Sequence, residues 1–336
     1  MSAASPLLEI SHVSKTYALE RPLSDVLARK PKARLKALRD VSLTVRPGEI
    51  LGVVGESGCG KSTLGRCIVG LDRPEQGTFA WQGGAFDSDR HERARQIQMV
   101  FQDPYASLNP RMTLGAILEE VLKVHGTAAD AQARQRRVDE LLLMVGLAPA
   151  LKDRLPHAIS GGQRQRISIA RALAVEPRLI IADEPVSALD ASVQAQIINL
   201  LEDLRAKLGI AIMFIAHDLN VVRHISDRIA VMYLGEIVEV AETEALFAGP
   251  QHPYTRGLLA AIPMPDPEVR SKAAGIEGEV PDPLAPPLGC GFSTRCPFVI
   301  PACRAEHPVL RESGRDHAVR CLNPQASTEF DFSHRF

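Results

Sequence analysis

Between residues 50 and 71 the sequence contains a short apolar run, a glycine-rich turn and a helical pattern. The run Ile50–Val54 is typical of a buried strand, and apolar side chains recur at helix-compatible spacing from residue 64 to residue 71. The segment between them, Gly55–Ser62, matches G-x-x-x-x-G-K-[ST]. In this strand–loop–helix context the pattern predicts a phosphate-binding loop, which requires a chain built around a buried sheet.

The chemistry of such a loop follows from its backbone. Glycines allow successive N–H groups to curl around phosphate oxygens, and the following helix N-terminus adds a favourable dipole. We expect Lys61 to reach the β- and γ-phosphates and the Ser62 hydroxyl to bind Mg²⁺. We expect the thiols of Cys59 and Cys67 to fill apolar space. The predicted nucleotide-binding residues of this segment are Gly55, Ser57, Gly58, Cys59, Gly60, Lys61, Ser62 and Thr63.

A second apolar run, Leu179–Ala182, ends in two adjacent acids, Asp183 and Glu184. Burying charge costs several kcal/mol unless it is compensated, and a bound cation would compensate it. We therefore expect Asp183 to hold the Mg²⁺ shell. Glu184 is expected to act as the general base that orients a water in line with the γ-phosphorus.

Strand and helix patterns alternate along the first 250 residues. Apolar runs at 210–215 and 229–232 predict two more strands, and 193–208 carries a helical stripe. This alternation predicts an α/β fold with a mostly parallel sheet covered on both faces. Helical patterns without intervening strands at 114–124, 132–144 and 163–174 predict an inserted helical subdomain over about 112–175.

Proline and cysteine mark a boundary near residue 250. Of 24 prolines, 13 lie in residues 250–336, and four of the six cysteines lie there too. Because proline breaks helices and sheet ladders, residues 263–287 are expected to be irregular. We therefore divide the chain into a domain of residues 1–250 and a small, irregular, cysteine-rich extension of residues 251–336.

Charge and hydropathy exclude several classes. The net charge of −1 argues against general nucleic-acid binding. No run of 18 apolar residues is present, and residues 1–6 have no apolar signal core, so we expect neither a membrane span nor secretion. Seven Lys or Arg lie in residues 21–39. They form either a solvated surface insertion or a contact for anionic lipid head groups.

Ile159–Gln163 (Ile-Ser-Gly-Gly-Gln) carries the most specific resemblance, to the signature motif of ABC transporter ATPase subunits. Other family elements occur in order over residues 7–250. Gln102 resembles the Q-loop residue, Asp190 the D-loop residue and His217 the switch histidine, while Tyr17 resembles the aromatic residue that stacks on adenine. The resemblance implies a P-loop NTPase core with an antiparallel β portion near the N-terminus.

The resemblance also implies a mechanism. Two ATPase subunits close head to tail, with each ATP between the phosphate-binding loop of one chain and the signature of the other. The implied catalytic residues are Lys61, Gln102, Glu184 and His217, and the implied Mg²⁺ residues are Ser62, Gln102 and Asp183. The implied nucleotide contacts add Tyr17, Ser160, Gly161, Gly162, Gln163 and Asp190. Hydrolysis reopens the dimer and drives transmembrane partners.

A narrower resemblance, to dipeptide and oligopeptide importers, rests on residues 101–111, on His252–Thr255 and on the cysteines. The chain is similar to the second of the two different ATPases that such importers use. This implies a heterodimer with a homologous ATPase, two transmembrane permease subunits and a periplasmic substrate-binding protein, at the cytoplasmic face of the bacterial inner membrane. Nickel chelates, opines, glutathione or metallophores are alternative substrates. A soluble ABC ATPase and an exporter ATPase are less favoured alternatives.

The extension spaces its cysteines as C-x5-C-x6-C-x17-C. A reducing cytosol disfavours disulfides, and four thiols in a proline-rich segment suggest a metal staple. The C-x-x-C pairs usual for structural zinc are absent from this spacing. The family resemblance favours a [4Fe–4S] cluster on Cys290, Cys296, Cys303 and Cys321, with zinc or no metal as alternatives. His307 and His317 are candidate substitute ligands.

Overall fold

Two sheets organise the computed structural model, which describes residues 5–19, 32–86, 90–262, 276–314 and 316–324. Within these ranges, eight strands form the larger sheet in the order β11-β12-β10-β9-β3-β8-β7-β6. Their bounds are β3 Ile50–Val54, β6 Ile97–Val100, β7 Leu179–Asp183, β8 Ala211–Ala216, β9 Arg228–Tyr233, β10 Glu236–Glu242, β11 Arg311–Gly314 and β12 His317–Val319. The strands from β9 to β6 are parallel, which confirms the predicted α/β class.

The central strands are buried on both faces, as their continuous apolar runs predicted. Side chains alternate between two cores because successive residues of a strand face opposite sides. In β3, Ile50 and Val54 join one core, and Leu51 and Val53 join the other. These buried central strands therefore have a fixed register, which fixes where each carboxyl end delivers the next loop.

The smaller sheet is antiparallel and confirms the β portion expected near the N-terminus. Its described strands follow the order β2-β1-β4-β5, with bounds β1 Leu8–Ala18, β2 Arg34–Val45, β4 Gln76–Trp81 and β5 Gly84–Ala85. It shares one core with α2 (Lys61–Ile68) and with one face of the larger sheet. Most of the basic segment 21–39 lies outside the described residues, and its last part, from Arg34, belongs to β2.

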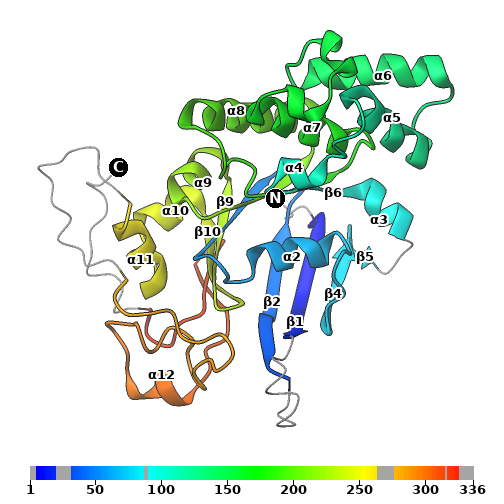
Figure 1. Cartoon of the computed structure of the whole chain (residues 1–336). Coiled ribbons are helices and arrows are strands. Elements are labelled where there is room, and N and C mark those ends of the chain that lie inside the picture. The colour runs from blue at the N-terminus through cyan, green and yellow to red at the C-terminus, as the bar shows by residue number, and fades with distance from the viewer. Residues whose placement is uncertain (1–4, 20–31, 87–89, 263–275, 315, 325–336) are drawn as a thin grey trace, which may run out of the picture.

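Helices α5 to α8 gather at one end of the molecule (Figure 1). Residues 112–175, all of which the structure describes, contain helices and connecting turns and no strand. The helices here are α5 Leu114–His125, α6 Ala131–Met144, η1 Pro149–Asp153, η2 Pro156–Ala158 and α7 Gly161–Leu173, and α8 Ala191–Leu208 follows β7. The other short helices among the described residues up to 250 are α3 Arg90–Gln96, α4 Pro104–Ser107, α9 Leu219–Ile225 and α10 Thr243–Ala248.

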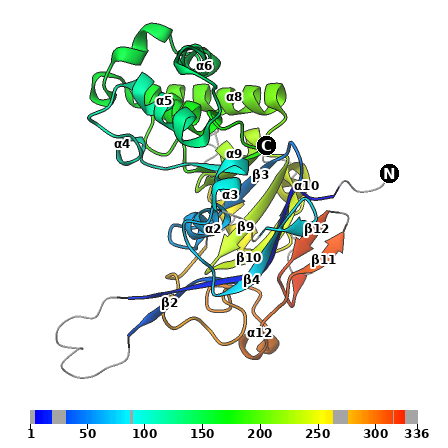
Figure 2. The ribbon, with the colours of Figure 1, turned by 90° about the vertical axis from the view of Figure 1, so that its right-hand side faces the viewer.

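The C-terminal extension is joined to the larger sheet by strand pairing. Strand β12 pairs antiparallel with β10, and β11 continues the sheet beyond it (Figure 2). Helices α11 (Pro253–Ala260) and α12 (Pro301–Ala305) precede these strands. The described residues 276–287 contain neither helix nor strand, as the prolines indicated, and residues 263–275 lie outside the described part.

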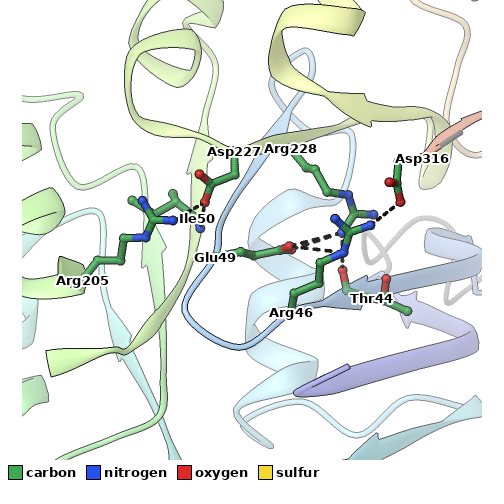
Figure 3. A network of polar contacts seen from close by, with 8 residues as sticks. All are labelled: Thr44, Arg46, Glu49, Ile50, Arg205, Asp227, Arg228 and Asp316. Atoms are coloured by element: carbon green, nitrogen blue, oxygen red, sulfur yellow. Dashed lines mark hydrogen bonds and ion pairs between the residues drawn. The ribbon is translucent and has the colours of Figure 1, made fainter. Parts of the chain in front are cut away.

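A network of polar contacts connects the amino end of β3 with β9 and with the C-terminal extension (Figure 3). Arg228 donates to the buried Glu49 carboxylate at 3.2 Å, and Arg46, which lies 3.9 Å from Glu49, pairs with Asp316 of the extension. Asp227 accepts the Ile50 N–H at 2.8 Å. The network lies at the opposite end of β3 from the glycine-rich loop, so it anchors the strand that carries the loop.

A search of the described helices for a membrane-spanning segment, judged by length and hydropathy, finds none.

Candidate functional site

The glycine-rich loop joins β3 to α2, the strand–loop–helix context that the sequence predicted. Gly60 has a φ of 109°, and a Cβ on it would lie 2.3 Å from the Ala37 carbonyl oxygen. A Cβ on Gly55 would lie 2.1 Å from the Met232 carbonyl oxygen. Both positions therefore require glycine, because any side chain would collide with backbone.

Lys61, the first residue of α2, folds back over the loop. Its Nζ donates to the carbonyl oxygens of Gly55 at 2.7 Å and Glu56 at 3.0 Å, and the side chain is buried. The ammonium therefore lies inside the curl of the loop, where an anion would meet it. The thiols of Cys59 and Cys67 are buried, and burial raises the pKa of the Cys67 thiol to about 11, as expected of apolar filling.

The end of β7 faces the start of α2. Ser62 Oγ donates to Asp183 Oδ1 at 2.9 Å, and Asp183 is buried. Burial is the main cause that raises the Asp183 pKa above its usual value, and neighbouring Glu184 adds to it, whereas Ser62 and Lys61 oppose it. A hydroxyl beside a buried carboxylate is the oxygen-rich pair that Mg²⁺ prefers, so these residues fit the predicted ion.

Glu184 lies where three strands end. Its φ of 45° is in the left-handed region, and its N–H donates to the Ile215 carbonyl at 2.9 Å. Gln102, which follows β6, donates from Nε2 to Glu184 Oε2 at 2.8 Å, and His217 Nδ1, after β8, lies 3.6 Å from the same oxygen. Because parallel strands deliver their carboxyl ends to one edge, residues distant in sequence converge here. A carboxylate so placed can accept a proton from an ordered water.

Tyr17 lies near the end of β1, where it is paired with Leu35 of β2. Its hydroxyl donates to Asp72 Oδ2 at 2.7 Å, and Asp72 also accepts from Arg66. Burial and the Asp72 hydrogen bond raise the Tyr17 pKa to about 12, and the Thr63 hydroxyl lowers it. Through Asp72, the Tyr17 hydroxyl is linked to Arg66 of α2, the helix that follows the loop.

The signature and Asp190 form a second group, at two neighbouring helix N-termini. Ser160 caps α7 through a reciprocal pair: it accepts the Gln163 N–H at 3.3 Å, and Gln163 Oε1 accepts the Ser160 N–H at 3.0 Å. Asp190 caps α8 by accepting the Val193 N–H at 2.9 Å. A Cβ on Gly162 would lie 2.5 Å from Val193 Cγ1, so the two helix starts pack directly together.

The four cysteines of the extension line one small cavity. All are free thiols, and burial raises the pKa of Cys290 to about 12 and that of Cys296 to about 11. The neighbouring cysteines add to both shifts, after burial. Nevertheless, no group of three or more His, Cys, Asp or Glu that could hold a metal ion is found among the described residues.

The two histidines considered as substitute ligands are held elsewhere. His307 Nε2 lies 3.0 Å from Glu236, and His317 Nε2 lies 2.8 Å from Glu239. Instead, His252 lines the cysteine cavity, a neighbour that the sequence analysis did not anticipate.

Two further residues missed by the sequence analysis contact the glycine-rich loop. Tyr254 accepts the Glu56 N–H through its hydroxyl at 2.9 Å, and Arg295 forms an ion pair with the Glu56 carboxylate. The sequence analysis noted the segment His252–Thr255 only for a family resemblance. Its residue types gave no indication that Tyr254 contacts Glu56.

Comparisons with known proteins agree with this geometry. Two family models match, "ABC transporter" over residues 38–187 and "Oligopeptide/dipeptide transporter, C-terminal region" over residues 238–303. The chain is 52% identical over 299 residues to the oligopeptide transport ATP-binding protein OppF of Salmonella typhimurium, covering 87% of this chain and 89% of the relative. It is 48% identical over 322 residues to the putative oligopeptide transport ATP-binding protein YkfD of Bacillus subtilis, covering 94% and 95%.

Solved structures with the same fold cover about 70% of the chain. One is the dimeric post-hydrolysis state of the ATP-binding cassette MJ0796 bound to ADP and Pi, with 31% identity and a TM-score of 0.60 over 70% of this chain and 98% of that one. Another is cbiO1 of Clostridium perfringens, part of the cbiONQ transporter complex, with 27% identity and a TM-score of 0.61 over 73% and 91%.

Proposed function

Because this chain belongs to the ABC transporter family, as an ATP-binding and ATP-hydrolysing subunit, we propose that it powers the import of dipeptides or oligopeptides across a bacterial inner membrane. The match of residues 238–303 to the family model of the oligopeptide/dipeptide transporter C-terminal region supports peptides as the substrate class. The names of the relatives, oligopeptide transport ATP-binding proteins, support it too. The observation that carries the ATPase role is the meeting of Lys61, Ser62, Asp183 and Glu184 at one sheet edge.

In this proposal the backbone N–H groups of residues 57–63 and the Lys61 ammonium bind the phosphates, beside the Tyr17 ring. Ser62, Asp183 and Gln102 hold Mg²⁺, which neutralises phosphate charge when bound. Glu184 accepts the proton of the attacking water, and Gln102 and His217 orient the Glu184 carboxylate. We also propose that His217, whose side chain is 56% exposed, contacts the γ-phosphate.

We propose that Ser160–Gln163 and Asp190 act on the nucleotide of a second ATPase chain. Within this chain they form a group separate from the phosphate-binding loop, at the amino ends of α7 and α8, where free N–H groups attract an anion. The dimer described for MJ0796 supports a two-chain arrangement. The partners proposed are a homologous ATPase forming a heterodimer, two permease subunits that hold this chain at the cytoplasmic membrane face, and a periplasmic substrate-binding protein.

We also propose that Cys290, Cys296, Cys303 and Cys321 hold a [4Fe–4S] cluster. Four thiols that line one cavity, two of them buried, support this, and thiolates are the usual ligands of such clusters. Its role here is structural: it braces an extension whose described residues 276–287 lack regular structure. The alternatives are a zinc ion or no metal at these cysteines, and iron, zinc and sulfide analysis distinguishes them from the cluster.

The test uses the assembled transporter in lipid vesicles, with its substrate-binding protein loaded with dipeptides or longer peptides. We expect peptide-dependent ATP hydrolysis that disappears in the Glu184→Gln variant. If hydrolysis depends on Glu184 but responds to nickel chelates or opines instead of peptides, the ATPase role stands and the peptide assignment is wrong. If hydrolysis persists in Glu184→Gln, the proposed site is wrong.

A further inference from the structure

The C-terminal extension holds the second residue of the phosphate-binding loop at two points. The Glu56 N–H donates to the Tyr254 hydroxyl at 2.9 Å. The Glu56 carboxylate accepts two hydrogen bonds from Arg295, Nη1 to Oε2 at 2.9 Å and Nη2 to Oε1 at 3.1 Å. The planar guanidinium fork matches a carboxylate in this two-bond geometry, which fixes orientation as well as distance.

Both holding residues are rigidly placed. Tyr254 is fully buried, and its ring packs against Tyr233 and Phe292 with centroids 4.6 and 5.6 Å apart. The His252 Nδ1 accepts the Tyr254 N–H at 3.0 Å and thereby caps α11. The Arg295 side chain is 6% exposed and also donates to the Tyr233 hydroxyl at 3.4 Å. An aromatic cluster, formed by Tyr233 of β9 with Tyr254 and Phe292 of the extension, therefore fixes both contacts to Glu56.

The charge of Glu56 gives these contacts a consequence for nucleotide binding. Glu56 lies in a loop that curls around phosphates, and its own carbonyl accepts from Lys61 Nζ. A carboxylate facing bound phosphates in a partly desolvated loop would repel them, because interactions between charges are strengthened away from water. Arg295 neutralises this carboxylate and turns it toward the extension, with the Glu56 side chain left 26% exposed.

We propose that Arg295 is a positioning residue for ATP binding: it turns the Glu56 carboxylate away from the phosphates and shields them from its charge, while Tyr254 fixes the loop backbone at the same residue. The inference rests on the proposed function of residues 55–63 as the ATP site. It makes the extension part of the nucleotide-binding machinery.

The test measures the dissociation constant of the full-length chain for a non-hydrolysable ATP analogue with Mg²⁺ by calorimetry. We expect Arg295→Gln to raise it roughly tenfold, since an unpaired, partly buried carboxylate is left beside the phosphates. Arg295→Gln combined with Glu56→Gln should return it to within about threefold of wild type, because the repelling charge is gone. Arg295→Lys, which keeps the charge without the fork, should fall between.

Arg320→Gln is the matched control. Arg320 is another buried arginine of the extension, but it donates to the carbonyls of Ile237 and Pro308 and not to the loop. The Arg320→Gln variant should have a lower melting temperature than wild type but the same dissociation constant for the ATP analogue. If the double variant binds as weakly as Arg295→Gln, or Arg320→Gln weakens binding equally, Arg295 has only a structural role and the proposal is overturned.

Two further variants separate the possible failures. Glu56→Gln alone removes a charge without removing the arginine, and it should bind the analogue at least as tightly as wild type. Tenfold weaker binding by Glu56→Gln would overturn the proposal even if Arg295→Gln does not fold. Lys61→Ala reports on the ATP site itself: if it binds like wild type, the proposed site fails and the positioning role with it.

Discussion

Gln102 donates a 2.8 Å hydrogen bond from Nε2 to Oε2 of Glu184, linking the loop after β6 to the end of β7. His217 Nδ1, after β8, lies 3.6 Å from that oxygen. Residues that follow β6 and β8, the strands on either side of β7, therefore orient one carboxylate. The left-handed backbone of Glu184 belongs to the same arrangement, because strain of this kind persists where the surroundings enforce it. The site is thus built around the orientation of Glu184.

Glu184→Gln should therefore separate nucleotide binding from hydrolysis. The amide keeps the size and can still bond with Gln102, but it cannot accept a proton from water. We expect ATP hydrolysis to fall at least about 100-fold, as for the loss of a general base, with Mg²⁺-ATP binding unchanged. Phosphate release and equilibrium nucleotide binding measure the two effects. Glu244→Gln, at a side chain that is 80% exposed, is the control and should hydrolyse ATP normally.

Acid should destabilise the chain through His252. Complete burial lowers the pKa of His252 to about 4, against opposing effects of Glu239 and Glu236, and Nδ1 accepts the Tyr254 N–H in the neutral form. The unfolded chain, with a histidine pKa near 6.5, therefore binds the extra proton first. The stability from neutral His252 is complete above about pH 6.5 and is lost as the pH falls toward 4.

Urea unfolding at pH 7.5 and 5.5 measures this effect. The contribution of His252 to the free energy of unfolding should decrease by about 1.4 kcal/mol between these pH values. His252→Asn, which keeps a helix-capping oxygen but does not titrate, should show a shallower dependence by that amount. Identical pH dependence in the two proteins would show that His252 is not the group responsible.

Much of the domain core could be predicted because its signals are local. Strands β3, β7, β8 and β9 are continuous apolar runs, and the helical stripes of α5, α6 and α7 are confirmed with ends shifted by two residues or fewer. The strand–loop–helix context of the glycine-rich loop and the position of Asp183 at the end of β7 could likewise be predicted from residue type and spacing. Such features need no knowledge of the tertiary fold.

The remaining features depend on long-range contacts. Strand β11 is short, polar and exposed, so its sequence lacks the apolar alternation of a half-buried strand. The contact between Glu56 and Tyr254 joins residues 198 positions apart, and that between Glu56 and Arg295 joins residues 239 apart. In the sequence, Tyr254 was noted only for a family resemblance. No local pattern around Arg295 indicates a contact with the glycine-rich loop.

Ser160→Ala should impair hydrolysis more than its effect on helix stability explains. It removes the cap of α7, which costs about 1 kcal/mol, and it removes the hydroxyl proposed to face a partner's nucleotide. Thr113→Ala is the matched control, because Thr113 caps α5 in the same way by accepting the Ala116 N–H at 3.3 Å. Both variants should melt earlier by similar amounts.

ATPase assays of the assembled transporter distinguish the two caps. We expect Ser160→Ala to lose most of its ATPase activity, Thr113→Ala to keep it, and both isolated chains to bind ATP normally. A similar loss of activity in both variants would mean that the signature acts only through helix stability. Weaker ATP binding by the isolated Ser160→Ala chain would place Ser160 at its own chain's nucleotide instead of a partner's.

The cysteine cavity gives the last prediction. The chain purified without oxygen should contain iron and acid-labile sulfide in about equal amounts, near four of each, as a [4Fe–4S] cluster requires. Cys303→Ser, at a buried cavity-lining position, should lose both, whereas Cys67→Ser, at a buried thiol of α2 outside the cavity, should keep both. Loss of the cluster should also lower the melting temperature, since metal binding adds to folding free energy. Zinc without sulfide would replace the cluster with a single-metal site, and the absence of iron, zinc and sulfide would leave four free thiols lining the cavity.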